Sequence, residues 1–241
     1  MLELKNITYT VSENGNDKTI INGLNLKVDD GKFVVITGPN GGGKSTLAKL
    51  IMGVGKITSG QILLDGEDIT EKSITDRANL GISFAFQQPV HFKGIKVLDL
   101  LRLAAGTELS VSQACEYLSK VGLCAKEYIH REVNASLSGG ELKRIEIATV
   151  LARGTKFSIF DEPEAGIDLW SFQSLIQVFE NIRNTINGTV LIISHQERIL
   201  NIADEIIVIQ DGKVREQGPK DAILPGLLGT SSAINACQKL S

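Results

Sequence analysis

Long hydrophobic runs are absent from this sequence. No apolar stretch approaches the roughly 18–20 residues that a membrane-spanning helix requires. Residues 1–5 also lack the charged and apolar blocks of a signal peptide. These two absences predict a soluble, cytoplasmic protein.

Cysteine is scarce and net charge is small. Cys115, Cys124 and Cys237 are widely spaced, form no C-x-x-C pair and cannot all pair in disulfides, so we expect a structural role or none rather than metal ligation. The 25 Lys and Arg residues nearly balance the 28 Asp and Glu residues, which leaves a net charge of −3. This balance indicates no nucleic-acid partner, but it is compatible with a small basic pocket for a nucleotide.

Glycine gathers in one short motif that matches the phosphate-binding loop pattern G-x-x-x-x-G-K-[ST]. Its residues are Gly38, Pro39, Asn40, Gly41, Gly42, Gly43, Lys44, Ser45 and Thr46. An apolar, strand-like run at 33–37 precedes it and a helix-like run at 47–52 follows it. Strand, glycine loop and helix in this order predict a nucleotide phosphate site.

The chemistry of such a site explains these residue types. Glycines let backbone N–H groups turn toward a phosphate, and the helix N-terminus adds a partial positive charge. Lys44 can reach the β- and γ-phosphates, while the Ser45 hydroxyl can ligate Mg²⁺.

A second apolar run, at 157–160, ends in the acids Asp161 and Glu162. Ligands of parallel sheets collect at the carboxyl ends of the strands, which predicts both acids beside the phosphate loop. We expect Asp161 to hold Mg²⁺, through water, and Glu162 to orient or deprotonate the attacking water.

A third motif begins at Leu137. Ser138 is a candidate N-cap, and Gly139 and Gly140 would expose backbone donors at a helix start, which indicates a second anion site. An ordinary capped helix is the alternative interpretation.

The order of elements predicts an α/β protein with a mostly parallel sheet, because strand-like runs at 33–37, 157–160, 189–193 and 206–209 alternate with helices. Strand-like residues at 2–9 and 24–28 form a β-rich start that predicts an antiparallel part beside that sheet. Residues 61–66 indicate a further strand and a turn. Helical patterns at 97–105 and 110–121 predict a helical subdomain at 88–136. We therefore expect one domain, 1–241, whose core comprises about 1–87 and 137–241.

The order of four motifs resembles the ATP-binding cassette (ABC) ATPase family. They are the phosphate loop, Leu-Ser-Gly-Gly-Glu at 137–141, Asp161-Glu162 and Ser194-His195. The resemblance covers nearly the whole chain. It implies a P-loop NTPase of the ABC type that binds ATP and Mg²⁺ and hydrolyses ATP. It also implies a head-to-tail homodimer formed around ATP, in which the signature residues Ser138, Gly139, Gly140 and Glu141 act in trans on the γ-phosphate.

The same resemblance assigns further site residues. Gln87 matches the glutamine that senses the metal and the γ-phosphate, with the adjacent Gln88 as the alternative. Asp168 matches the aspartate that communicates across the dimer, and His195 matches the switch histidine at the γ-phosphate. Tyr9 is a candidate for adenine stacking, with Val11 or Ile20 as alternatives and a core or surface role for Tyr9 nearly as plausible.

Within that family, residues 76–90, 138–144, 164–168 and 195–200 are similar to the SufC group, the ATPases of the Suf iron–sulfur cluster assembly machinery. This similarity implies SufB- or SufB/SufD-like scaffold partners. The alternative is the nucleotide-binding subunit of a membrane transporter, in which case the chain would meet the membrane only indirectly.

Trp170, just past Asp168, is a candidate for packing near the dimer seam, although a core or surface role is the simpler interpretation. The chain departs from the SufC group at Pro163 and in a short segment between Gln87 and Leu137.

Overall fold

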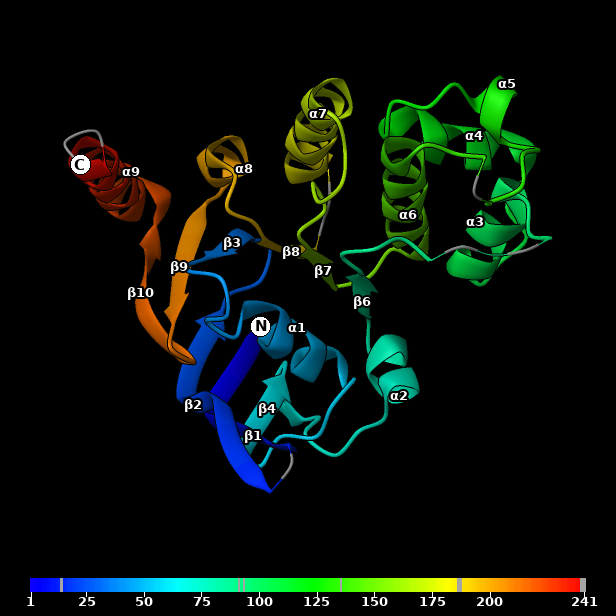
Figure 1. Ribbon diagram of the computed structural model, residues 1–241. Helices are drawn as coiled ribbons and strands as arrows, with labels where there is room; N and C mark the ends of the chain where they lie inside the picture. The colour runs from blue at the N-terminus through cyan, green and yellow to red at the C-terminus, as the bar shows by residue number, and fades with distance from the viewer. Residues whose placement is uncertain (14, 91, 93, 135, 186–187, 239–241) are drawn as a thin grey trace.

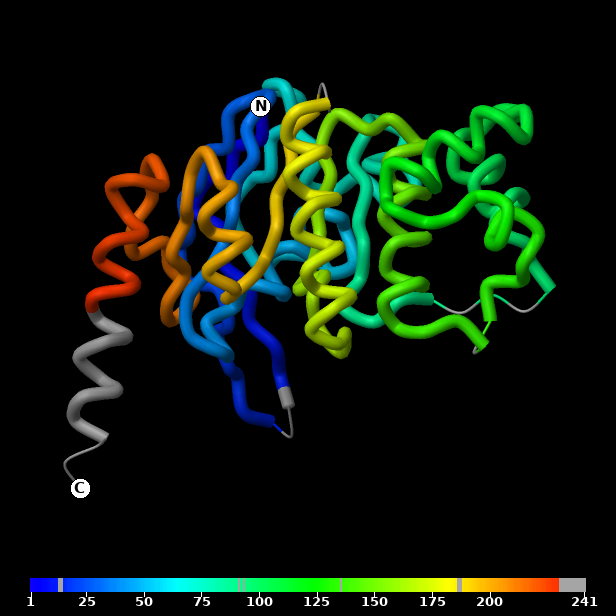
Figure 2. The backbone as a smooth tube through the Cα atoms, turned by 90° about the horizontal axis from the view of Figure 1, so that it is seen from above, coloured from blue at the N-terminus to red at the C-terminus, as the bar shows by residue number. Residues whose placement is uncertain are grey.

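The computed structural model describes residues 1–13, 15–90, 92, 94–134, 136–185 and 188–238, with the backbone alone at 13 and 230–238. Two sheets and their helices form the molecule, and three helices extend from one end of it (Figures 1 and 2).

The larger sheet is parallel except at one edge, as predicted. Its strand order is β10-β9-β3-β8-β7-β6, and only β10 pairs antiparallel with its neighbour. A hairpin at Asp211-Gly212 joins β9 to β10. The strands are β3 (Phe33–Thr37), β6 (Ile82–Ala85), β7 (Phe157–Asp161), β8 (Thr189–Ile193), β9 (Glu205–Gln210) and β10 (Lys213–Pro219).

The smaller sheet is antiparallel, which confirms the prediction from the β-rich start of the chain. Its order is β2-β1-β4-β5. The strands are β1 (Leu2–Glu13), β2 (Asn16–Val28), β4 (Ser59–Leu64) and β5 (Glu67–Asp68). Helix α1 (Lys44–Met52) lies between the two sheets, and α2 (Ile74–Asn79) flanks it (Figure 1).

The opposite face of the larger sheet carries the remaining long helices. These are α6 (Gly139–Arg153), α7 (Leu169–Thr185), α8 (Glu197–Ile202) and α9 (Lys220–Gln238) (Figure 1). Helices α3 (Val97–Ala105), α4 (Val111–Lys120) and α5 (Ala125–Tyr128) form the projecting end.

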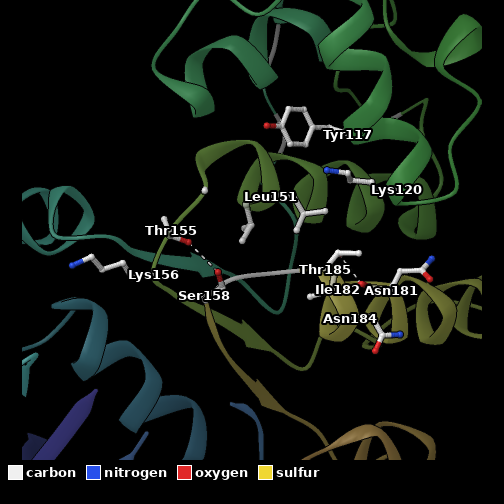
Figure 3. Close-up of a pocket in the computed structure, with 13 residues that line it drawn as sticks. Tyr117, Lys120, Leu151, Thr155, Lys156, Ser158, Asn181, Ile182, Asn184 and Thr185 are labelled. Carbon is white, nitrogen blue, oxygen red and sulfur yellow. Dashed lines mark hydrogen bonds between the residues drawn. The ribbon is translucent and has the colours of Figure 1, made fainter. Parts of the chain in front are cut away.

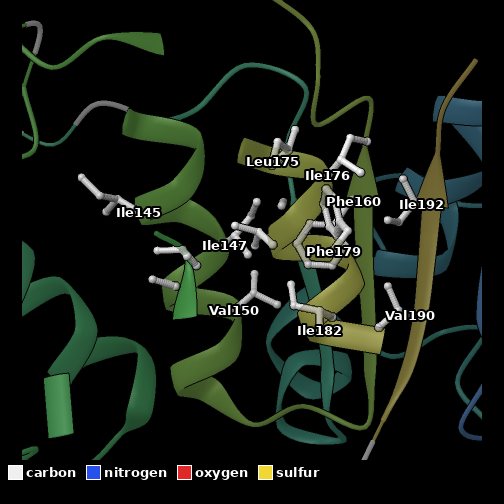
Figure 4. Close-up of a cluster of buried hydrophobic side chains, with 14 of the residues drawn as sticks. Ile145, Ile147, Val150, Phe160, Leu175, Ile176, Phe179, Ile182, Val190 and Ile192 are labelled. Carbon is white, nitrogen blue, oxygen red and sulfur yellow. The ribbon is translucent and has the colours of Figure 1, made fainter. Parts of the chain in front are cut away.

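Alternation along the buried strands divides the core into two layers. Val34 and Ile36 face α1 and the antiparallel sheet, whereas Phe33 and Val35 face the helices on the other side. Strand β8 alternates in the same way, because successive side chains of a strand point to opposite faces. On the second face, Ile147 and Val150 of α6 meet Phe179 of α7 above the sheet (Figure 4).

The segment 88–136 was predicted to hold only helices, and α3, α4 and α5 are its helices. Among its described residues there is also one isolated antiparallel bridge, between Lys96 and Glu132. Helix α6, which begins after this segment, packs against α3 and α4. The helical layer therefore continues past residue 136 into the part that sequence analysis assigned to the core.

The helix that follows the phosphate loop is anchored at its far end by a buried arginine. Arg77 is 2% exposed, and its guanidinium donates to the carbonyls of Leu50 and Ile51 at 2.7 and 2.8 Å. It also donates to the carbonyls of Thr70 and Lys72. Because the last carbonyls of a helix lack intrahelical donors, this residue caps α1.

Candidate functional site

The phosphate loop joins the carboxyl end of β3 to the start of α1. Gly38 has φ 131°, and a Cβ there would lie 2.0 Å from the Ile209 carbonyl oxygen. Gly43, the N-cap of α1, has φ 100°. Backbone conformation and close packing therefore both demand glycine at these positions.

Lys44 is the first residue of α1 and is 5% exposed. Its Nζ donates to the carbonyl oxygens of Gly38 and Pro39 at 2.8 and 2.9 Å. Burial lowers the pKa of Lys44, and the negative charges of Glu162 and Asp161 oppose that shift. The phosphate loop thus holds the Lys44 ammonium group close to the carboxylates of Glu162 and Asp161.

A cavity of about 480 Å³ opens over this loop. Gln87 and Glu162 line it together with loop residues, so two predicted catalytic side chains share the cavity with the phosphate loop. Its lining is Lys18, Ile20, Asn40, Gly41, Gly43, Lys44, Ser45, Thr46, Gln87 and Glu162. Lys18 was missed by sequence analysis, because a lysine in an exposed strand carries no signal of its own.

Ser45 and Asp161 meet at the floor of the site. The Ser45 hydroxyl donates to Asp161 Oδ1 at 2.8 Å, and Asp161 is 2% exposed. Burial raises the pKa of Asp161, and the bond from Ser45 opposes the rise. Hydroxyl and carboxylate oxygens are the hard ligands that Mg²⁺ prefers, so this pair fits a magnesium site.

Glu162 follows Asp161 and leaves the strand with φ 44°. Its N–H donates to the Ile193 carbonyl of β8 at 3.0 Å. Gln87 Nε2 donates to Glu162 Oε2 at 2.7 Å, and His195 Nε2 lies 3.7 Å from Glu162 Oε1. The structure therefore brings Gln87 and His195, which the resemblance assigned, together with Glu162, which the end of the apolar strand predicted. Gln88 lines a neighbouring cavity instead and is not among the residues lining the phosphate-loop cavity.

Burial lowers the pKa of His195, and the positive charge of Lys44 lowers it further. Glu162 acts in the opposite direction. Since the ordinary value is 6.5, His195 is mainly the neutral imidazole at pH 7, with one ring nitrogen able to accept a proton.

Beneath His195 lies a carboxyl group that sequence analysis did not assign. Glu164 Oε1 accepts a hydrogen bond from the fully buried Ser194, while its Oε2 is buried without a partner among the described residues. Burial raises the pKa of Glu164, and the charge of Glu162 adds to the rise.

Tyr9 does not line the phosphate-loop cavity, whereas its alternative Ile20 does. Tyr9 is half-buried and packs into the core layer beneath α1, close to Gly55. Its ladder partner is Ile21, which is fully buried. The strand register therefore turns Tyr9 toward the core. Of the three candidates for the adenine contact, Ile20 alone lines this cavity, and the contact itself stays a prediction.

The signature residues form the tip of α6. Ser138 is the N-cap: its side chain accepts from the Glu141 N–H, and the Glu141 carboxylate accepts from the Ser138 N–H. Glu141 also accepts a hydrogen bond from Tyr128. A Cβ on Gly140 would lie 2.6 Å from Ser171 Oγ, so this tip packs against α7. None of these signature residues lines the cavity over the phosphate loop of the same chain.

Asp168 precedes α7 and caps it. Its carboxylate accepts from the Trp170 N–H, the Ser171 N–H and the Ser171 hydroxyl at 2.7–3.0 Å. Trp170 is 83% exposed and the neighbouring Leu169 is 71% exposed. Two adjacent apolar side chains thus stand in solvent beside the signature tip.

A second cavity, of about 460 Å³, lies between α4, the end of α6 and α7 (Figure 3). Thr155 and Ser158 on its wall hydrogen-bond to each other at 2.9 Å and to Ser83. Its lining includes none of the predicted site residues. The phosphate-loop cavity is therefore the candidate site.

The cysteines take no part in the site. Cys115 is half-buried and Cys124 is exposed, and both are free; the side chain of Cys237 lies outside the described part. Across the residues with described side chains, no three His, Cys, Asp or Glu residues gather as a metal cluster. Of the helices that the structure describes, none has the length and apolar character needed to cross a bilayer.

Comparison of the sequence with known proteins also indicates an ATP-binding protein of the ABC type. The family model described as "ABC transporter" matches residues 21–165. An uncharacterized ABC transporter ATP-binding protein of Methanocaldococcus jannaschii, MJ0035, is 39% identical over 214 residues, which is 85% of each chain. The iron–sulfur cluster assembly protein SufC of Plasmodium falciparum is 36% identical over 90% of this chain and 66% of its own length. The probable ATP-dependent transporter ycf16 of Antithamnion is 33% identical over 93% of each chain.

Solved structures agree with this result. The chain superposes on a dimeric ATP-binding cassette, MJ0796, in a post-hydrolysis state with ADP and Pi. The TM-score is 0.81 with 25% identity, over 91% of this chain and 99% of that one. It also matches a nucleotide-free cassette from an ABC transporter with TM-score 0.79, over 95% of each chain. Motif order, site geometry and relatives agree, and the chain belongs to the ABC family of ATP-hydrolysing cassettes.

Proposed function

We propose that Glu162 is the general base of this ATPase. Its carboxylate faces the phosphate-loop cavity and is within reach of Gln87 and His195. It would orient and deprotonate the attacking water, while Lys44 stabilises charge on the β- and γ-phosphates. His195, as a neutral imidazole, would accept or donate a hydrogen bond at the γ-phosphate.

Ser45 and Asp161 would hold Mg²⁺, with Gln87 at its edge. When bound, the ion supplies charge neutralisation between the β- and γ-phosphates. The bond between Ser45 and Asp161 supports this assignment, because it brings two hard oxygen ligands to within 2.8 Å of each other.

We also propose that two copies meet head to tail around ATP. The phosphate-loop cavity of one chain includes none of its own signature residues. The tip of α6 carries free helix N–H groups and would complete the site of the second copy. Asp168 and the exposed Trp170 would lie at this seam.

The partner we propose is a scaffold subunit of iron–sulfur cluster assembly, of the SufB or SufD type. The observation that carries this proposal is the 36% identity to SufC of Plasmodium falciparum along 234 residues. Closure of the ATP dimer would move the scaffold so that iron, sulfide or cluster enters or leaves it.

An apolar groove of about 310 Å³ supports a protein partner. It lies between helices α3 and α6 and residues 86–90, which we call the Gln87 segment. The groove would belong to the helical part that we propose for residues 88–136. Phe86, Val90 and Leu103 line it with 39%, 49% and 73% of their surface exposed. Exposed large apolar side chains around a groove are typical of a docking surface.

The second candidate is the nucleotide-binding subunit of a membrane transporter. The similarity to MJ0035 and ycf16, which are both named as transporter proteins, favours it. The same dimer closure and the same groove would then drive membrane helices, so the catalytic residues do not separate the two functions.

A binding experiment separates them. The tagged protein is mixed with a purified SufB/SufD-type scaffold, and in parallel with detergent-solubilised permease of the same organism. We expect stable capture of the scaffold and stimulation of ATP turnover. Leu103→Glu should abolish the capture, and the equally charged change Val54→Glu, at an exposed position outside the groove, should preserve it. Capture of the permease alone would overturn the assembly function.

A further inference from the structure

A lysine and a glutamate are buried together one to two turns inside α6. Lys143 is 2% exposed and the Glu146 side chain is 15% exposed. Lys143 Nζ donates to Glu146 Oε2 at 3.2 Å. Burial raises the pKa of Glu146, and the charge of Lys143 opposes the rise. Burying both charges is costly unless other groups use them, so their remaining contacts are informative.

Both residues bind the backbone of one residue on another element. The Phe86 N–H donates to Glu146 Oε1 at 3.0 Å, and the Phe86 carbonyl accepts from Lys143 Nζ. Phe86 directly follows β6, an edge strand of the sheet. Ion-assisted bonds to both backbone groups hold this residue against α6, because hydrogen bonds to charged groups are stronger than neutral ones.

The residue after Phe86 is Gln87, whose amide reaches Glu162 at 2.7 Å. A continuous set of contacts thus runs from α6, through the Phe86 backbone, to the catalytic carboxylate. The signature tip is the N-terminal end of the same helix, one to two turns before the pair. Phe86 and Glu146 also line the apolar groove proposed for the partner. The pair therefore lies where the signature, the groove and Gln87 meet.

We propose that the Lys143–Glu146 pair is a positioning device that holds Gln87 against Glu162 and makes the Gln87 segment move with the signature helix. The inference rests on the proposed roles of Glu162 and Gln87 in hydrolysis. Neither Lys143 nor Glu146 lines the phosphate-loop cavity. They act through the Phe86 backbone, so a shift of α6 changes the geometry at Glu162.

The test is an epistasis measurement of ATP turnover. Glu146→Gln keeps an acceptor for the Phe86 N–H but leaves the Lys143 charge unpaired. We expect kcat to fall about 10- to 100-fold, as for a misplaced catalytic group, with KM for ATP changed by less than about twofold. In a Gln87→Ala background the same substitution should lower kcat by no more than about twofold, because its effect passes through Gln87.

A double variant with a neutral pair at positions 143 and 146 controls for misfolding caused by an unpaired buried charge. Lys143→Met combined with Glu146→Gln leaves no buried charge, yet Phe86 loses its Lys143 donor. This double variant should show the same lower kcat in the native background and the same lack of effect beside Gln87→Ala. Lys156→Met, at a lysine whose side chain is 72% exposed, is the matched control and should keep native kcat.

Equal losses of kcat with and without Gln87 would overturn the inference, and so would unchanged kcat in both Lys143–Glu146 variants. Measuring Glu162→Gln alongside separates failure of the positioning device from failure of the catalytic assignment. If Glu162→Gln is inactive while the epistasis is absent, only the positioning device fails. If Glu162→Gln retains native turnover, the catalytic assignment fails and the inference fails with it.

Discussion

At the residue scale, Glu162 lies at the centre of the contacts within the site. Its carboxylate bonds to Gln87 and lies near His195, while the backbone before it delivers Asp161 to Ser45. Lys44 lies among these groups with a lowered pKa. In the proposed mechanism nucleotide binding and water activation depend on different atoms, so single substitutions should separate them.

Glu162→Gln should bind ATP normally and lose turnover by ~10²-fold or more, because the amide cannot accept the proton of the attacking water. Phosphate release and binding of a fluorescent ATP analogue are the two measurements. Lys44→Ala, in contrast, should weaken binding and turnover together. Native turnover in Glu162→Gln would contradict the assignment of the base.

Glu164 gives a pH prediction. Burial raises its folded-state pKa above the ordinary 4.5, so the native state binds more protons than the unfolded chain above that pH. The stability it contributes is complete below pH 4.5 and is lost as pH rises through the folded-state pKa. Glu164→Gln removes this loss. The free energy of unfolding of the variant, relative to the native protein, should therefore increase from pH 4.5 upward in urea titrations, and a flat difference would contradict the raised pKa.

Site residues differed in how well they could be predicted. Asp161 and Glu162 end an apolar strand, and the edge rule for parallel sheets then places them. Tyr9 depended on the register of β1 and β2, which a single sequence does not give. Lys143 and Glu146 resemble the polar face of an amphipathic helix, and their contacts with the Phe86 backbone, far away in the sequence, could not be predicted.

At the scale of elements, the tip of α6 is packed too closely for any side chain at Gly140. A Cβ there would lie 2.6 Å from Ser171 Oγ and 2.7 Å from Ser171 Cβ. The signature tip, α7 and Asp168 are consequently in direct contact within one chain. Movement of the tip should be transmitted to the segment that follows Glu162.

Gly140→Ala should destabilise the fold by about 1–3 kcal/mol, as overpacking does. Ser171→Gly should cost about 1 kcal/mol, because it loses a side chain in the first turn of α7. Combined, the two changes should cost clearly less than their sum, since the glycine removes the atoms that clash with the new methyl group. Urea unfolding measures all three variants. Additive costs would show that the two positions are not in contact.

Elements were predicted best where every residue of a strand is buried. The runs at 33–37, 157–160 and 189–193 correspond to β3, β7 and β8. Strand β6 has four residues, too few to show a period, and was not predicted. Helix α7 was also not predicted, although Leu175, Phe179 and Ile182 recur at helical spacing; the signal was present in the sequence.

At the scale of the whole molecule, the catalytic strand ends and the signature tip lie on separate parts of one chain. The phosphate-loop cavity closes only if another surface covers it. The cassette to which this chain is similar is dimeric, and in the proposed dimer a second copy would supply such a surface. Trp170 is the single tryptophan of the sequence and is 83% exposed, so it can report on this closure.

Glu162→Gln with Mg²⁺ and ATP should double in mass by light scattering, and Trp170 emission should shift to shorter wavelength as the indole leaves water. Lys44→Ala should do neither under the same conditions. A doubled mass without a spectral change would place Trp170 outside the seam. A constant mass at saturating ATP would contradict the dimer itself.

The left-handed backbone at Glu162 sets folding against activity at one position. With φ 44°, a residue bearing a Cβ is strained there, and glycine is not. Glu162→Gly should therefore unfold at higher urea than Glu162→Ala, by about 1 kcal/mol in free energy, while both remain inactive. If glycine proves no better than alanine, the strain is absent. If glycine is better, the side chain at this position is a cost to the fold that selection for turnover maintains.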